Sequence, residues 1–123
     1  MEIAYNYFRI AVNTKYENVV VCLEKIFGKL ESYLNSKRVF LITDRYLEII
    51  ENEYYDAWMA DFDEDYWYYY RYNIEIFSRN DKPTLEEQIN LSKKIKEEFI
   101  NYGIKQVEII AEFEHLLCEN HKK

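Results

Sequence analysis

The part of this chain with the clearest potential for binding chemistry is a window without positive charge. Between Arg45 and Arg71 there is no lysine or arginine, but there are eight carboxylates and ten aromatic side chains. Aromatic groups supply contact area in protein interfaces, and carboxylates attract a basic partner. We therefore interpret the window as a docking surface for a basic macromolecule. The residues expected to contact that partner are Glu53, Asp56, Trp58, Asp61, Asp63, Asp65, Trp67 and Tyr69.

Two clusters resemble metal sites but do not meet the requirements of one. The acidic run from Asp61 to Asp65 has no glycine for a calcium loop, and Tyr72 stands where the final bidentate acid would be needed. The tail spaces His115, Cys118 and His121 like zinc ligands, but the chain offers no second ligand pair. We expect neither a metal nor another cofactor.

Motifs for catalysis are also missing. The sequence has no nucleophile elbow and no glycine-rich phosphate loop, and it has no Cys/His pair outside the tail. Carboxylates such as Glu75, Glu112 and Glu114 fall on predicted strands, where a solvated sheet face is their common role. We expect a protein that is not an enzyme.

Length and charge narrow the classes of partner. The 123 residues fit a single domain over 1–123, and the net charge of −7 opposes direct binding of nucleic acid or anionic membranes. The first residues lack the pattern of a signal peptide, and no apolar run reaches the length of a membrane span. Cys22 and Cys118 lie far apart, and we expect both to be reduced in a cytoplasmic protein.

The first half of the chain shows alternating and helical patterns in turn. Residues 3–13 alternate as a half-buried strand. Thr14 and Glu17 have the spacing of a capping box, which predicts a helix over about 15–35. An apolar run then predicts a strand over 39–43.

The acidic and aromatic window itself is ambiguous. Residues 46–58 suit either one face of a helix or a strand, and we favour a strand over 46–55 because tyrosine and isoleucine are frequent there. We expect a loop over 57–65. The next strand is predicted over 66–78, where alternate positions from Tyr66 to Ile76 are all tyrosine or isoleucine and the positions between them carry Arg71, Asn73 and Glu75.

The second half repeats the helix and strand signals. Thr84 and Glu87 form another capping box, and Gly103 is placed to end the helix that follows. A last strand is predicted over 105–114. The two helices should bury Leu23, Phe27, Ile95 and Phe99.

This order of elements predicts an α+β fold, namely a ferredoxin-like β-α-β-β-α-β sandwich with both helices on one face of an antiparallel sheet. The other face should be partly open, and an aromatic, acidic open face suggests a contact surface or a homodimer interface. Its candidate residues are Tyr5, Tyr7, Arg9, Trp67, Tyr69, Arg71, Glu108 and Glu112.

One resemblance adds to this interpretation. Tyr70-Arg-Tyr-Asn-Ile-Glu-Ile, a capped helix, Gly103 and the segment from Val107 to Leu117 together resemble small stand-alone immunity proteins of bacterial polymorphic-toxin loci. The resemblance covers about the last 50 residues and implies a small inhibitor, without assigning a role to any residue.

The function that we expect is a non-catalytic inhibitor that masks the active site of a basic partner, such as a toxin nuclease. Carboxylates would stand in for the phosphates of the nuclease's substrate, and aromatic side chains would fill the interface. A phage-type inhibitor of a nucleic-acid-guided nuclease would use the same physics. A dimeric ferredoxin-like ligand-sensing module is the alternative from another class.

Overall fold

The computed structural model describes residues 6–32, 38–42, 45–62, 67–79 and 84–111. Within these ranges the strands are β1 Tyr7–Val12, β2 Glu31–Ser32, β3 Val39–Ile42, β4 Arg45–Glu51, β5 Tyr72–Ser78 and β6 Val107–Ile110. The helices are α1 Tyr16–Phe27, α2 Ala57–Phe62 and α3 Leu85–Asn101, with a 3-10 turn, η1, at Trp67–Tyr69. The order of elements confirms the expected α+β class.

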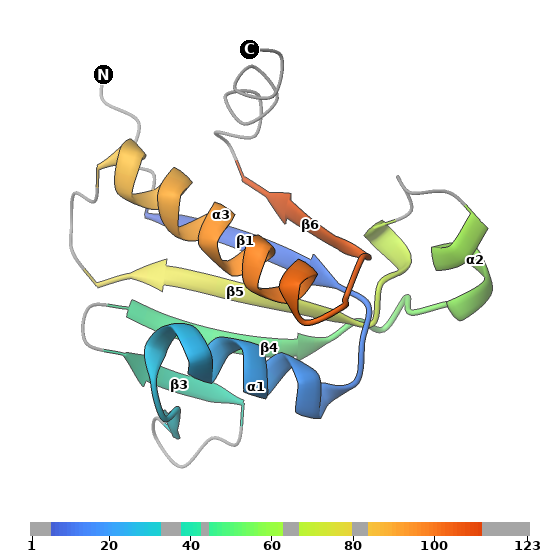
Figure 1. Cartoon of the computed structure of the whole chain (residues 1–123), viewed down its shortest axis with the longest axis horizontal. Helices are drawn as coiled ribbons and strands as arrows, with labels where there is room; N and C mark the ends of the chain where they lie inside the picture. The colour runs from blue at the N-terminus through green and yellow to red at the C-terminus, as the bar shows by residue number, and fades with distance from the viewer. Residues whose placement is uncertain (1–5, 33–37, 43–44, 63–66, 80–83, 112–123) are drawn as a thin grey trace.

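The strands form one antiparallel sheet in the order β2-β3-β4-β5-β1-β6. The helices α1 and α3 pack side by side against one face of this sheet, and α2 lies beyond one end of it (Figure 1). The connection between β4 and β5 turns back at that end. We call residues 52–71 the β4–β5 connection.

The core lies between the two long helices and the sheet. In β1 and β5, Phe8 pairs with Ile76 and Ile10 pairs with Ile74, and all four side chains are fully buried. Period-2 alternation puts these residues on the helix side and their polar neighbours on the other face.

Of the four helix residues expected to be buried, three are buried in the structure. Leu23, Ile95 and Phe99 are fully buried, which confirms those predictions. Phe27 is only half-buried, because it is the last residue of α1 and packs at the edge of the core.

The helix α1 is shorter than the predicted span of 15–35. It ends at Gly28, whose φ of 78° is in the region that favours glycine, and the chain then enters β2. The capping box expected at Thr14 is also wrong, because the N-cap is Lys15 and the Thr14 hydroxyl accepts a hydrogen bond from Asn18 Nδ2.

The second capping box is confirmed. The Thr84 hydroxyl accepts a hydrogen bond of 3.1 Å from Glu87 N, at the first turn of α3. Gly103 follows the end of α3 with a φ of 93°, as expected for a helix terminator.

The predictions for the acidic and aromatic window are partly wrong. The extended structure favoured over 46–55 is confirmed as far as Glu51, where β4 ends. The loop expected over 57–65 instead contains α2, and the strand expected over 66–78 begins only at Tyr72, after η1. Long-range contacts of the β4–β5 connection, described below, override the local patterns.

In the part of the chain that the structure describes, no helix has both the length and the apolar character required to cross a membrane.

Candidate functional site

The β4–β5 connection is folded against the end of the sheet instead of projecting into solvent. Ala60 of α2 and Tyr70, just after η1, pack against Ala11 of β1 and form a second small core with it, in which all three residues are buried. Trp67 and Tyr69 pack around this core and are half-buried. Part of the sheet face opposite α1 and α3 is therefore covered by the chain itself.

One amide side chain closes the base of the connection. Asn52 Nδ2 donates hydrogen bonds of 2.7 Å to the carbonyl oxygens of both Tyr68 and Tyr70, and Asn52 Oδ1 accepts one of 3.0 Å from Tyr54 N. The backbone adds bonds from Asn52 N to Arg71 O, 2.9 Å, and from Asp56 N to Tyr69 O, 3.2 Å. The two ends of the connection are thus held together.

A second polar network fixes α2 to the sheet. Gln106 Nε2 donates to Ala60 O at 2.7 Å and to Asp61 Oδ1 at 3.2 Å, while Gln106 Oε1 accepts from Asn13 Nδ2 at 2.7 Å. Asn13 Oδ1 in turn accepts from Arg71 N at 3.3 Å. These contacts join α2 and the end of the connection to Asn13, after β1, and to Gln106, before β6.

The surface of this anchored connection carries large aromatic side chains in contact with each other. Trp58 and Phe62, one turn apart on α2, are 69% and 65% exposed, with ring centroids 5.4 Å apart. Tyr54 and Tyr68, 55% and 49% exposed, stack at 5.3 Å with an interplanar angle of 26°. Exposed aromatic pairs of this kind are typical of interaction surfaces.

The acids predicted to bind a partner have mixed surroundings. Glu53, Asp56 and Asp61 are exposed, but two of them also hold the fold. The Asp56 carboxylate accepts bonds from Trp58 N and Met59 N, so that it caps α2, and Asp61 binds Gln106. Among the three described acids, Glu53 is the one whose carboxylate neither caps α2 nor binds Gln106; it acts on the neighbouring Tyr54 instead.

Of the four other residues predicted to contact a partner, two lie in a different element than expected and two lie outside the residues that the structure describes. Trp67 and Tyr69 were expected on an open strand face, but they belong to η1 and are half-buried. Asp63 and Asp65 lie outside the described residues.

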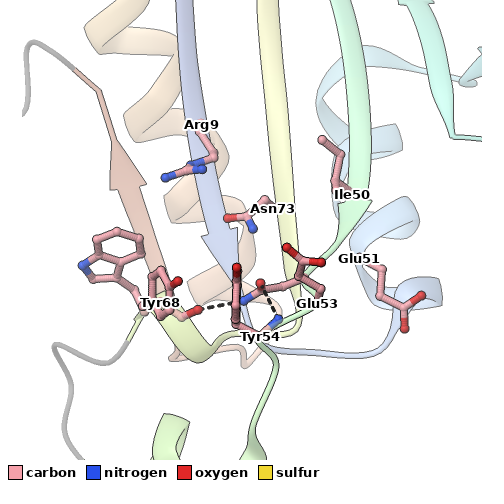
Figure 2. Close-up of a pocket in the computed structure, with 9 residues that line it drawn as sticks. Arg9, Ile50, Glu51, Glu53, Tyr54, Tyr68 and Asn73 are labelled. Atoms are coloured by element: carbon pink, nitrogen blue, oxygen red, sulfur yellow. Dashed lines mark hydrogen bonds between the residues drawn. The ribbon is translucent and has the colours of Figure 1, made fainter.

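A pocket of about 380 Å³ opens between the connection and the sheet. Arg9 and Asn73, from the neighbouring strands β1 and β5, line it together with Tyr54 and Tyr68, and Glu53 lies beside Tyr54 (Figure 2). The remaining lining residues are Ile50, Glu51, Asn52 and Trp67.

The two ends of the pocket differ in charge. At the sheet end, the Arg9 guanidinium lies 6.0 Å from the centre of the Trp67 ring, and its buried Nε has no hydrogen-bond partner among the described residues. At the end formed by the connection, the nearby Glu53 carboxylate, followed by Tyr68, raises the pKa of the Tyr54 phenol. The local field there is negative, which favours a cation.

The rest of the open sheet face is aromatic and acidic. Tyr7 and Phe77 are cross-strand partners, about 37% and 38% exposed, with ring centroids 4.8 Å apart. Glu48 and Glu75 are also register partners, and the Tyr7 hydroxyl donates a 2.9 Å hydrogen bond to Glu75 Oε1. Like charges on paired positions oppose each other, and Arg9, the register partner of Glu75 on β1, supplies a positive charge on the same face.

Among the described residues, no three histidine, cysteine or acidic side chains gather in a way that could hold a metal ion. His115, Cys118 and His121, whose spacing was judged insufficient for a zinc site, lie outside the described residues, as do Tyr5, Glu112 and Glu114.

The sequence did not single out four residues that matter most to this site. Asn52 and Gln106 are lone amides, and the local pattern gives no signal for their bonds across the sheet. Tyr54 and Tyr68 belonged to the aromatic window, but neighbours in the sequence were preferred to them. No protein-family model, curated protein or solved structure matches this chain.

Proposed function

We propose that this chain is a non-catalytic binding protein of the immunity or inhibitor type. It would neutralise a basic protein, such as a nuclease toxin of the bacterial cytoplasm, by covering its active site. The observation that carries this proposal is the exposure of Trp58 and Phe62 on an anchored, acidic connection.

The physical argument has two parts. Exposed aromatic side chains that a partner desolvates act as anchors and set the lifetime of a complex. Carboxylates around them, here Glu53 and Asp61, attract a basic partner and raise the association rate. The bonds of Asn52 and Gln106 fix the connection in advance, so that little conformational entropy is lost on binding.

We also propose a ferredoxin-like core as the scaffold. The strands β6-β1-β5-β4 follow one another in the sheet, and α1 and α3 cover one face, as that fold requires. On this interpretation β2 and β3 are a hairpin added between α1 and β4, which extends the sheet at one edge.

The test is inhibition of a partner that the protein captures in its native host. We expect a basic nuclease whose activity falls when the purified protein is added, and whose inhibition is weakened by Trp58→Ala. Ile100→Ala is the matched control, because Ile100 is 48% exposed but lies on α3. A captured protein that binds Trp58→Ala as tightly as the wild type would contradict the proposal.

The pocket between Arg9 and Tyr54 supports a second candidate, a ligand-sensing module. In a dimeric form of it, Tyr7 and Phe77 would pack against the same face of another copy. Sedimentation at micromolar concentration tests the dimeric form of this module, which predicts twice the mass of a single chain. A nucleic-acid-guided nuclease as the target would be distinguished by the identity of the captured partner.

A further inference from the structure

We propose that the pocket receives an arginine side chain of the basic partner, with its guanidinium stacked on the Tyr54–Tyr68 pair and paired with Glu53. This inference rests on the proposed function and assigns one contact within it. It concerns the end of the pocket formed by the β4–β5 connection.

The first argument is that most arginines of this chain lie over aromatic rings. Four of them lie within 6.0 Å of an aromatic ring, namely Arg9 over Trp67, Arg38 over Tyr16, Arg71 over Tyr72 and Arg79 over Tyr46. A guanidinium is weakly hydrated and planar, so it gains from lying on such a ring. Among the described residues, no lysine or arginine lies over the ring of Tyr54 or Tyr68, although both are exposed.

The second argument is the position of the carboxylate. Figure 2 shows Glu53 next to Tyr54 on the pocket side, whereas Glu51 points away from the other lining residues. A carboxylate beside a stacked ring pair offers both interactions that a guanidinium makes, a bidentate ion pair in the plane and a ring face above it. An ammonium would use the ion pair but would lose more of its hydration.

Arg9 limits how far the partner's arginine side chain can enter the pocket toward the sheet. It already lies against Trp67 at the sheet end, so a second cation is excluded from there. The guanidinium is therefore confined to the end with Tyr54, Tyr68 and Glu53. The Asn73 amide, between the two ends, can accept a hydrogen bond from it.

The test needs no partner, because a single capped residue serves as the probe. We would titrate N-acetyl-L-arginine amide into the full-length, isotopically labelled protein and follow the amide resonances of residues 53, 54 and 68 and the indole of Trp67. We expect saturable shifts confined to these signals, with a dissociation constant on the order of 10 mM, since one side chain makes few contacts. N-acetyl-L-citrulline amide, the uncharged analogue, should cause no saturable shift, and N-acetyl-L-lysine amide should bind more weakly.

Two variants and their controls assign the contact. Glu53→Gln should weaken the arginine probe by about fivefold or more, because it removes a charge-assisted hydrogen bond. Tyr68→Leu should weaken it about threefold or more, because it removes the ring face but keeps an apolar side chain. Glu97→Gln and Tyr102→Leu, at exposed positions on and after α3, should leave binding unchanged.

The inference is overturned if Glu53→Gln binds the probe like the wild type, or if the citrulline analogue shifts the same resonances. It is also overturned if acetate rather than arginine saturates the pocket, because Arg9 would then determine the ligand. Failure of this inference is separable from failure of the proposed function. If binding of the captured partner depends on Trp58 but not on Glu53, only the inferred pocket contact is wrong. If the pocket binds the arginine probe but no basic partner is captured, only the proposed function is wrong.

Discussion

Replacing Asn52 should loosen the whole β4–β5 connection, because this one side chain joins both of its ends. Asn52→Ala removes two donated bonds of 2.7 Å and one accepted bond of 3.0 Å. Each such bond contributes about 1 kcal/mol net, and water can replace the exposed ones in part, so we expect a loss of about 2 kcal/mol. For a domain of this size, that loss lowers the melting temperature by roughly 8 °C.

The assay for this prediction combines equilibrium unfolding in urea with amide hydrogen exchange. Exchange should accelerate most at the amide of Tyr54, which bonds to Asn52, and at that of Asp56, which bonds to Tyr69. Asn52→Asp should be at least as damaging, because its carboxylate would face two carbonyl oxygens. Asn90→Ala, at an exposed position on α3, is the control. A change below about 0.5 kcal/mol for Asn52→Ala, in the range of neutral surface substitutions, would refute the reasoning.

Three further predictions concern the core and two titrating groups. Phe99→Ala should lower the free energy of unfolding by about 3–5 kcal/mol in urea titrations, because Phe99 is fully buried; a loss under 1 kcal/mol would contradict this packing. Tyr7 has its pKa raised to about 12 by burial and then by Glu75, so the stability that it contributes is full below pH 10 and is lost as the pH rises toward 12; ultraviolet titration should show a late-titrating component that Glu75→Gln moves to lower pH, and an unchanged curve in that variant would contradict the contact. Burial raises the pKa of the Cys22 thiol to about 11, so in a Cys118→Ser variant thiol labelling at pH 8 should be slow until the protein is unfolded, and fast labelling would show that Cys22 is accessible.

Where elements were predicted correctly, the local pattern and the tertiary contacts agree. In α3 the Thr84 cap, the apolar stripe through Ile95 and Phe99, and Gly103 all indicate the same helix. In β1 and in β5 from Tyr72 onward, side chains alternate between the core and the open face, and the period-2 pattern is sufficient to detect this.

The β4–β5 connection could not be predicted in this way. The run of aromatic residues upstream of Tyr72 is typical of a strand, but there the backbone turns, and Asn52 binds the carbonyls of Tyr68 and Tyr70. The helix α2 has only six residues, and its stability comes from Asp56 as a cap and from burial of Ala60 against Ala11. These contacts join distant parts of the chain and leave no local signature.

The candidate site was therefore predicted as a region but not residue by residue. The high density of acidic and aromatic residues in the sequence correctly indicated the β4–β5 connection as the candidate region. The exposure expected for Glu53 and Trp58 is found. Exposure of Trp67 was overestimated because a strand was assumed where η1 forms. The pocket was not expected, since it requires the connection to fold over Arg9.

The most direct test of the docking surface is the kinetics of the captured partner at two salt concentrations. Trp58→Ala should raise the dissociation rate by about 30-fold, as truncating an anchor worth about 2 kcal/mol does, and should leave the association rate nearly unchanged. Glu53→Gln should instead slow association at low salt and reduce its dependence on salt. Unchanged rates in both variants, measured beside the Ile100→Ala control, would contradict the account and leave the connection as a solubilising surface.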